Sequence, residues 1–150
     1  MAIVFSPAGV QRVKTRLLDS DTFSYLIRRQ EPVASRAKDY ILRHGALTIS
    51  VITYYEVLRG LLYADAQRQL AMFEALVRDN PVLPLSLAAS REAARLYVIF
   101  RRAGTPIEDA DLLIAAIALA NDCILVTNNI RHYARVPGLE LENWADSSTA

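Results

Sequence analysis

The stretch that most constrains the fold is residues 16–25, RLLDSDTFSY, where a short apolar run ends in an acidic residue and passes at once into helix-forming residues. Such a junction is typical of a buried strand that leads directly into a helix. Parallel α/β sheets keep their ligand sites beyond the carboxyl ends of the strands, so Asp19 lies where such folds carry out chemistry. Asp21 shares that edge. Asp19, Ser20 or Asp21 is equally suited to cap the helix that follows, and this second interpretation stays open.

The remainder of the chain alternates between short strands and helices. Strands are predicted at residues 15–19, 46–50, 82–85, 123–127 and 139–141. Helices are predicted at residues 21–29, 33–43, 53–77 with a break near residue 65, about 86–102, and 106–120. This alternation predicts an α/β domain in which a mostly parallel sheet is covered by helices on both faces.

Length and composition indicate one domain, because 150 residues suffice for a sizeable core. We predict a folded domain over residues 15–144, a loosely ordered extension over 1–14 and a disordered tail over 145–150. The longest apolar run, LLIAAIALA at residues 112–120, falls short of the roughly 18 residues that cross a membrane. Cys123 is the only cysteine, which excludes an intrachain disulfide and fits a reducing cytoplasm. The formal net charge of +1 means that any grip on nucleic acid depends on local Lys and Arg clusters.

Glu56 lies near the start of the third predicted helix. Thr53 and Glu56 match a capping box, in which the two side chains satisfy free backbone amides, and this local role would explain the glutamate. Arg59 and Gly60 follow Glu56 on the same helix face. A glycine costs a helix interior about 1 kcal/mol relative to alanine, so we expect something to approach this face closely at Gly60.

Asp111 lies near the start of the last long helix. Thr105, Pro106 and Glu108 predict that this helix begins at the proline, with a threonine cap and a glutamate at the third position. Asp111 then falls beyond the first turn, where the helix dipole no longer favours an anion. The segment that follows, LLIAAIALA, is apolar around the whole cylinder and predicts a buried helix. A carboxylate at the mouth of such a helix needs a partner.

The topology brings these acids to one edge of the sheet. Asp19 closes the first strand, Glu56 follows the second, Asp111 opens the helix before the strand at 123–127, and Asn129 follows that strand. Two like charges about 4 Å apart repel by about 4 kcal/mol at an effective dielectric of 20, so clustered carboxylates take up protons or bind a cation. Carboxylate oxygens without a thiolate or histidine cluster favour a hard cation, Mg²⁺ or Mn²⁺, and hence phosphoryl chemistry.

Four segments, in order, resemble the motifs of the PIN-domain family and in particular its VapC-type toxin ribonucleases: LLDSDTFSYLI, SVITYYEVLRG, PIEDADLLIAAIALA and ILVTNN. The match extends from about residue 15 to residue 144. The resemblance implies a three-layer α/β/α domain with a central parallel sheet. It also implies metal-dependent hydrolysis of RNA, with in-line attack that leaves a 5′-phosphate and a 3′-hydroxyl.

The resemblance assigns roles by position to the acidic residues. Asp19, Glu56 and Asp111 match the family's first three acids. Asp19 and Asp111 are expected to hold Mg²⁺ or Mn²⁺, and Glu56 is expected to orient or deprotonate the attacking water. The family's fourth acidic position is occupied by Asn129, which carries no charge. Whether the site holds one metal ion or two therefore stays undecided. Asp21 and Asp109 are accessory candidates to supply the missing charge.

Basic residues and partners follow from the same resemblance. Arg59 and Arg131 are candidates to contact RNA phosphates, followed by Arg28 and Arg29, and each is equally well explained as surface charge. The family pairs with a VapB-like antitoxin that blocks the acidic pocket, and its members often self-associate, so we expect a homodimer. His132 is interpreted as a loop residue without a Ser or Cys motif to act with it.

Two other functions remain as alternatives. Asp19 and Asp21 resemble the two-aspartate motif of haloacid-dehalogenase-like phosphatases. That motif usually has a threonine where this chain has Phe23, and neither Lys14 nor Lys38 lies where that family has its later lysine. The other alternative is a non-catalytic module whose acids only cap helices and which binds a partner or RNA. The missing fourth aspartate keeps this alternative open.

Overall fold

The computed structural model describes residues 13–147 of the chain. The predicted extension over residues 1–14 lies almost entirely outside this range, and so does the end of the predicted tail. Within the described range, no helix has the length and apolar character needed to cross a membrane.

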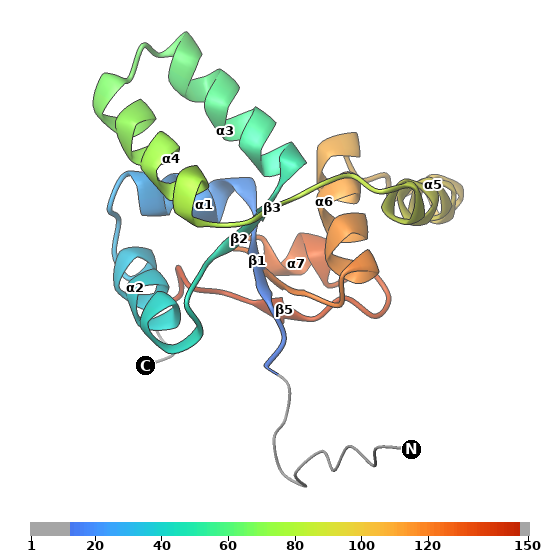
Figure 1. Ribbon diagram of the computed structural model, residues 1–150. Coiled ribbons are helices and arrows are strands. Elements are labelled where there is room, and N and C mark those ends of the chain that lie inside the picture. The colour runs from blue at the N-terminus through green and yellow to red at the C-terminus, as the bar shows by residue number, and fades with distance from the viewer. Residues whose placement is uncertain (1–12, 148–150) are drawn as a thin grey trace, which may run out of the picture.

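Strands and helices alternate along the described residues (Figure 1). The strands are β1 Arg16–Leu18, β2 Thr48–Ser50, β3 Val82–Leu83, β4 Ile124–Val126 and β5 Leu141–Glu142. The helices are α1 Ser20–Ile27, α2 Val33–His44, α3 Val51–Tyr63, α4 Gln67–Asp79, α5 Leu87–Arg102, α6 Asp109–Ala120 and α7 Ile130–Tyr133. The predicted break near residue 65 is confirmed, since Asp65 has a left-handed backbone with φ of 50° between α3 and α4.

The five strands form one sheet in the order β3-β2-β1-β4-β5, and every neighbouring pair is parallel. The prediction of an α/β domain with a mostly parallel central sheet is therefore confirmed. The central strand is β1, which pairs with β2 on one side and β4 on the other. Because all strands run in one direction, their carboxyl ends share one edge, and Asp19 directly follows β1 at the middle of that edge.

Alternation along the strands produces two separate cores, one on each face of the sheet. Leu17 and Leu125 are fully buried in a core built mainly from α5 and α6. Their neighbours Leu18 and Val126 are fully buried in a second core with residues of α1, α2, α3 and α4. Successive strand residues point to opposite faces, so each of these short strands needs apolar residues on both. The result is the expected α/β/α arrangement, with α1–α4 and α5–α7 on opposite sides of the sheet in Figure 1.

The predicted capping box at Thr53 and Glu56 is wrong. The residue that caps α3 is Ser50, whose Oγ accepts a hydrogen bond from the Thr53 amide at 3.1 Å. Thr53 lies within the helix and is fully buried. Because β2 passes into α3 without a connecting loop, the helix begins two residues before the predicted cap, and the Glu56 side chain is free for other contacts.

The predicted start of α6 at Pro106 is also wrong. The helix begins at Asp109, and the preceding Glu108 makes no side-chain capping bond. Ile107 is only 5% exposed and packs into the same core as Leu112, which keeps the segment before Asp109 out of the helix. Asp111 therefore lies in the first turn, where the helix dipole does favour an anion.

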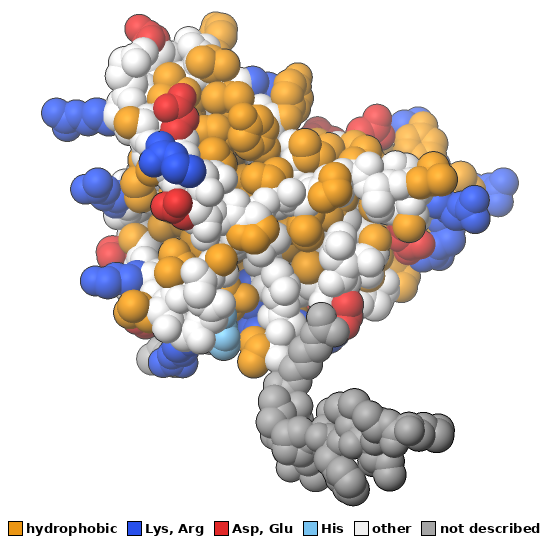
Figure 2. Space-filling view, viewed as in Figure 1, with side chains coloured by type: hydrophobic (Ala, Val, Ile, Leu, Met, Phe, Trp, Pro, Cys, Tyr) orange, Lys and Arg blue, Asp and Glu red, His pale blue; other side chains and the backbone are white. Residues whose placement is uncertain are grey.

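Apolar side chains are also exposed on the surface, and several lie on α3. Figure 2 shows a group of hydrophobic side chains over this helix, whereas Lys and Arg side chains extend from the margins of the view. The exposed large apolar residues of α3 are Val51, Tyr55, Leu62 and Tyr63, the last being 96% exposed. A cluster of this kind on one helix is a candidate contact surface for a partner.

Candidate functional site

Asp19 lies at the carboxyl end of the central strand and also caps the helix that follows. It directly follows β1, and its Oδ1 caps α1 by accepting a hydrogen bond from the Thr22 amide at 2.8 Å. The residue is only 5% exposed. Burial raises the pKa of this carboxyl to about 6, although hydrogen bonds from Thr127 and Thr22 stabilise its charged form. The nearby charge of Asp21 raises the pKa further.

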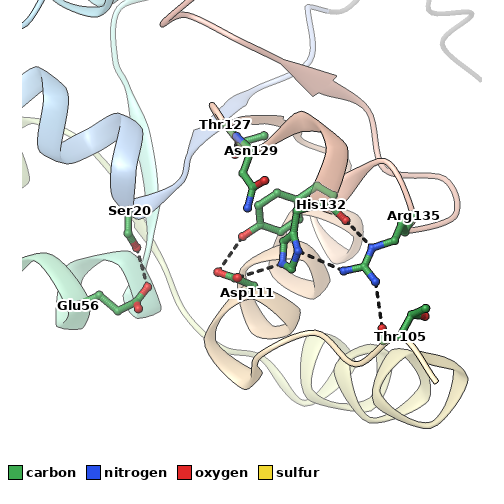
Figure 3. Close-up of polar contacts among 9 residues, drawn as sticks. Ser20, Glu56, Thr105, Asp111, Thr127, Asn129, His132 and Arg135 are labelled. Carbon is green, nitrogen blue, oxygen red and sulfur yellow. Dashed lines mark hydrogen bonds and ion pairs between the residues drawn. The ribbon is translucent and has the colours of Figure 1, made fainter. Parts of the chain in front are cut away.

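Glu56 extends from α3 toward the start of α1. Ser20 donates a hydrogen bond from its Oγ to Glu56 Oε1 at 2.7 Å, as Figure 3 shows. Arg59, one turn along the same helix, approaches Glu56 Oε2 at 3.8 Å, too far for a hydrogen bond. The Glu56 side chain is 22% exposed, so it is oriented by Ser20 and still reaches solvent.

Asp111 is held by two side chains of the short helix α7. His132 Nε2 lies 3.0 Å from Asp111 Oδ2, and the Tyr133 hydroxyl donates to Asp111 Oδ1 at 3.1 Å (Figure 3). His132 lies in the helix α7 and contacts Asp111, so the expectation that it is a loop residue is wrong. The Asp111 side chain is 32% exposed, so both of its oxygens are bonded to the protein while solvent still reaches it.

The three acids affect one another's surroundings without forming a tight cluster. Tyr133 shows their proximity: burial raises the pKa of its hydroxyl, and the charges of Asp111, Asp19 and Glu56 raise it further. However, no group of three or more His, Cys, Asp or Glu side chains within residues 13–147 is arranged to hold a metal ion. Glu56 and Asp111 are instead turned toward their own hydrogen-bond partners in Figure 3.

The chemistry of these donors nevertheless fits a hard divalent cation. Carboxylate oxygens are the ligands that Mg²⁺ and Mn²⁺ prefer. The groups that stabilise the buried Asp19 charge are neutral, namely the Thr22 amide and hydroxyl and the Thr127 hydroxyl. A buried carboxylate with only neutral donors carries a desolvation cost that a bound cation would offset.

The remaining candidates of the sequence analysis lie around this edge with different surroundings. Asn129 is exposed at the start of α7, and its backbone N–H donates a hydrogen bond to Thr127 Oγ1 at 2.9 Å. Asp21 is exposed in the first turn of α1. Asp109 lines a separate, largely apolar pocket of about 550 Å³ between α5 and α6.

The basic candidates are exposed, and one of them borders a pocket beside Glu56. Arg28, Arg29, Arg59 and Arg131 all lie on the surface. Arg28, Glu56 and Gly60 line a pocket of about 280 Å³ between α1 and α3. Apart from the surrounding backbone of α3, no atom of residues 13–147 lies within 4 Å of where a Cβ on Gly60 would be. No other element of the described chain therefore approaches Gly60 closely.

Comparison with known proteins identifies the family. The model of the PIN domain matches residues 16–139, which is most of the chain. The chain belongs to the PIN-domain family. The predicted resemblance is therefore confirmed, and the haloacid-dehalogenase-like alternative has no support.

Relatives of this PIN domain are ribonucleases of the VapC group. The tRNA(fMet)-specific endonuclease VapC of Shigella flexneri is 31% identical over 130 residues, which cover 86% of this chain and 97% of that protein. Ribonuclease VapC1 of Haemophilus influenzae is 25% identical over 129 residues, 85% of this chain and 96% of that protein. The structure of DNA-bound VapBC from Salmonella typhimurium superposes with a TM-score of 0.78 at 29% identity, covering 88% of this chain and 99% of that one.

Four contact residues of this PIN domain were missed by the sequence analysis as parts of the site. They are Ser20, Thr127, His132 and Tyr133. Ser20 and Thr127 each adjoin a strand end that had been predicted, so position alone could have suggested them. His132 and Tyr133 gave no such signal, because their partner Asp111 is 21 and 22 residues away in the chain.

Proposed function

We propose that this chain is a divalent-metal-dependent endoribonuclease and the toxin of a VapBC-type toxin–antitoxin pair. Membership of the PIN-domain family and similarity to VapC ribonucleases over 86% of the chain support this function. The observation on which it rests most directly is Asp19, a carboxylate that is 5% exposed at the carboxyl end of the central strand and whose hydrogen-bond donors within residues 13–147 are neutral. Such a group favours a cation at the place where parallel α/β domains bind their ligands.

The acids of the site have two different roles, binding the cation and activating the water. Asp19 and Asp111 hold the cation, which is Mg²⁺ or Mn²⁺ by the preference of carboxylate oxygens. A bound divalent ion supplies Lewis-acid charge that activates water and neutralises phosphate oxygens. Glu56, oriented by the Ser20 hydroxyl at 2.7 Å, directs or deprotonates the attacking water. Asn129 is a neutral ligand candidate at the fourth position of the family pattern.

The RNA is positioned by phosphate contacts rather than by a basic surface, since the net charge is only +1. Arg28 lines the pocket beside Glu56, and Arg59 lies one turn from Glu56 on α3. These two arginines are the nearest candidates for backbone phosphates of a strand that enters the site. Arg131, next to His132 on α7, is the candidate on the other side.

The partner of the toxin is a VapB-like antitoxin. This part of the proposal draws on related complexes named VapBC, including those of Salmonella typhimurium and Rickettsia felis, the latter with a TM-score of 0.78. Exposed apolar side chains on α3 offer contact area for the antitoxin or for a second copy of the chain. We expect a homodimer in solution, which light scattering of the purified toxin measures.

The decisive test is cleavage of RNA by the purified full-length chain. Initiator tRNA is the first substrate to try, with Mg²⁺, Mn²⁺ or a chelator in parallel reactions and with sequencing of both product ends. We expect metal-dependent cuts that leave 5′-phosphates and that disappear in Asp19→Asn. Asp79→Asn, an exposed carboxylate at the end of α4, is the matched control and should cleave normally.

A non-catalytic RNA- or partner-binding module is the second candidate function. Asn129 in place of an acid and the absence of a ready three-acid cluster within residues 13–147 favour it. If neither metal supports cleavage of tRNA, rRNA or mRNA, and Asp19→Asn changes nothing, the nuclease proposal is wrong. RNA or antitoxin binding that survives Asp19→Asn would then support the module.

A further inference from the structure

A chain of polar contacts extends from Asp111 away from the proposed reaction centre, and the proposed function gives it no role. It passes from Asp111 to His132 and from His132 to Arg135, as Figure 3 shows. Arg135 in turn contacts the backbone of Thr105, which lies in the connection between α5 and α6. The contacts thus link the segments at Thr105 and Arg135, which are 30 residues apart in the chain, to the Asp111 carboxylate.

Arg135 is held in place by all three of its guanidinium nitrogens. Nε donates to the His132 carbonyl at 3.1 Å and Nη1 donates to the Thr105 carbonyl at 3.0 Å. Nη2 lies 3.1 Å from His132 Nδ1. The guanidinium also lies over the Phe100 ring, 5.5 Å from its centroid. Its direction relative to the imidazole is therefore fixed by four contacts.

This arrangement selects one tautomer of His132. An arginine is always protonated and can only donate hydrogen bonds, so His132 Nδ1 must accept from Nη2 and carries no proton. The proton of the neutral ring then resides on Nε2. Nε2 lies 3.0 Å from Asp111 Oδ2, so it donates to the carboxylate. The hydrogen bond at Nδ1 thus determines that Nε2 is the donor, as in many metal sites.

Both oxygens of Asp111 receive a hydrogen bond from α7, because Tyr133 donates to the other oxygen at 3.1 Å. An ionised carboxylate offers about four lone-pair positions, so two hydrogen bonds leave lone pairs for a cation. The two donors also remove the rotation that a side chain 32% exposed would otherwise have. The two donors therefore fix the orientation of the Asp111 carboxylate and leave lone pairs on it for a cation.

We propose that Arg135, acting through the Nε2–H tautomer of His132, is a positioning residue that sets the direction of Asp111 for a divalent cation. This inference rests on the proposed function, in which Asp111 is a ligand. Neither Arg135 nor His132 needs to touch the cation or the RNA. Hydrogen bonds made directly to a metal ligand, such as that of His132 to Asp111, typically contribute 10- to 100-fold to metal affinity.

The first experiment reads the tautomer directly and needs no metal. The chain has two histidines, so a His44→Gln variant leaves the His132 ring as the only imidazole in a ¹⁵N spectrum. We expect a protonated Nε2 and an unprotonated Nδ1 at pH 8, and a shift of the Nδ1 resonance in Arg135→Ala. A ring protonated on Nδ1, or an Nδ1 resonance that ignores the loss of Arg135, overturns the inference.

The second experiment is a double-mutant cycle on Mn²⁺ affinity, measured by calorimetry on the full chain. His132→Gln keeps an amide donor near the Nε2 position but no longer depends on Arg135. We expect Arg135→Ala to weaken Mn²⁺ binding by about tenfold or more in the wild-type background. In the His132→Gln background, we expect the same change to have almost no effect. Arg101→Ala, which removes an arginine stacked on Tyr97 of α5, is the matched control.

The outcomes separate this inference from the proposed function. An equal loss in both backgrounds means that Arg135 only anchors the connection at Thr105, and tighter Mn²⁺ binding in Arg135→Ala means that His132 competes with the cation. Either result overturns the inference and leaves the nuclease intact. A wild-type chain that binds no Mn²⁺ overturns the metal-dependent function instead, while the ¹⁵N spectrum still decides whether Arg135 sets the tautomer.

Discussion

Asp19 and Asp111, the two proposed cation ligands, are held in opposite ways. Asp19 is almost fully buried and is bonded to its own helix start, three residues away. The Asp111 side chain is one-third exposed and is bonded to a histidine and a tyrosine on a different helix. One carboxylate is fixed by local chain geometry, and the other by a distant element.

The difference has an energetic consequence. Asp19 has a pKa raised to about 6 by burial, so its ionised form lowers the stability of the folded protein. Asp111 keeps contact with water and gains two donors, so its surroundings contain no comparable penalty. The buried charge of Asp19 thus favours binding of a cation at the sheet edge. The hydrogen bonds from α7, in contrast, fix the orientation of the Asp111 side chain.

The largest effect is expected from removing the charge that the fold destabilises. Asp19→Asn keeps an oxygen that can cap α1 but loses the charge, and we expect RNA cleavage to fall by about 10³-fold, since a lost cation removes several kcal/mol of transition-state stabilisation. The same variant should unfold at a higher temperature than the wild type when a chelator is present. Initial cleavage rates and thermal unfolding, with Asp79→Asn alongside, measure both. Loss of activity together with loss of stability would instead mean that Asp19 is mainly structural.

The second effect is the pH dependence of that stability difference. Asp19 has a folded pKa of about 6 against an ordinary value of 3.8, so the folded state binds the proton more tightly than the unfolded chain. Well below pH 3.8 the carboxyl is protonated in both states and costs nothing. As the pH rises from 3.8 through 6, ionisation lowers the wild-type free energy of unfolding by about 3 kcal/mol relative to Asp19→Asn.

Denaturant unfolding of both proteins between pH 4 and pH 8, with chelator present, measures this difference. Other titrating groups are shared by the two proteins and cancel. A difference that stays constant over the range would show that Asp19 is not buried in the way described. Added Mn²⁺ should restore wild-type stability above pH 6 and leave Asp19→Asn unchanged, because a ligand stabilises only the form that binds it.

The third effect probes the other carboxylate. Tyr133→Phe removes the hydroxyl that donates to Asp111 Oδ1 but keeps the buried ring. We expect Mn²⁺ affinity to fall about tenfold, as is usual for a hydrogen bond behind a metal ligand. Stability should change little, because the released Asp111 oxygen is reached by water. Calorimetry and thermal unfolding measure the two quantities, and a destabilised protein with unchanged Mn²⁺ binding would contradict the role given to Tyr133.

The contrast between the two acids also explains what the sequence could predict. The parallel sheet and the position of Asp19 rest on local signals, namely a short apolar run, a polar junction and a helix start. These signals act within a few residues, and they led to the right fold and the right strand end. The bonds that fix Asp111 come from residues 21 and 22 positions away, and nothing in the local sequence identifies them.

Local signals also failed where tertiary burial competes with them. Thr105, Pro106 and Glu108 form a good helix start by composition, yet α6 begins at Asp109. The reason is Ile107, whose side chain enters the core and holds the preceding segment outside the helix. At α3 the difference is smaller, because Ser50 and Thr53 are both suitable caps and only the direct passage from β2 selects the serine.

The smallest effect is expected at Glu56, because its neighbour Arg59 is bound less closely than His132 is to Asp111. Arg59 is exposed and lies 3.8 Å from Glu56, beyond hydrogen-bond distance, whereas His132 lies 3.0 Å from Asp111. Exposed pairs of this kind contribute little to stability, so Arg59→Ala should leave the free energy of unfolding nearly unchanged. If Arg59 contacts a phosphate, the salt dependence of RNA binding should decrease by about one ion in its slope, equally for different RNA sequences. Arg95→Ala removes another exposed arginine with an i,i+3 glutamate partner, Glu92 on α5, and is the control. An identical salt slope for both variants would show that Arg59 is plain surface charge, and that Glu56 is oriented by Ser20 without help from the arginine.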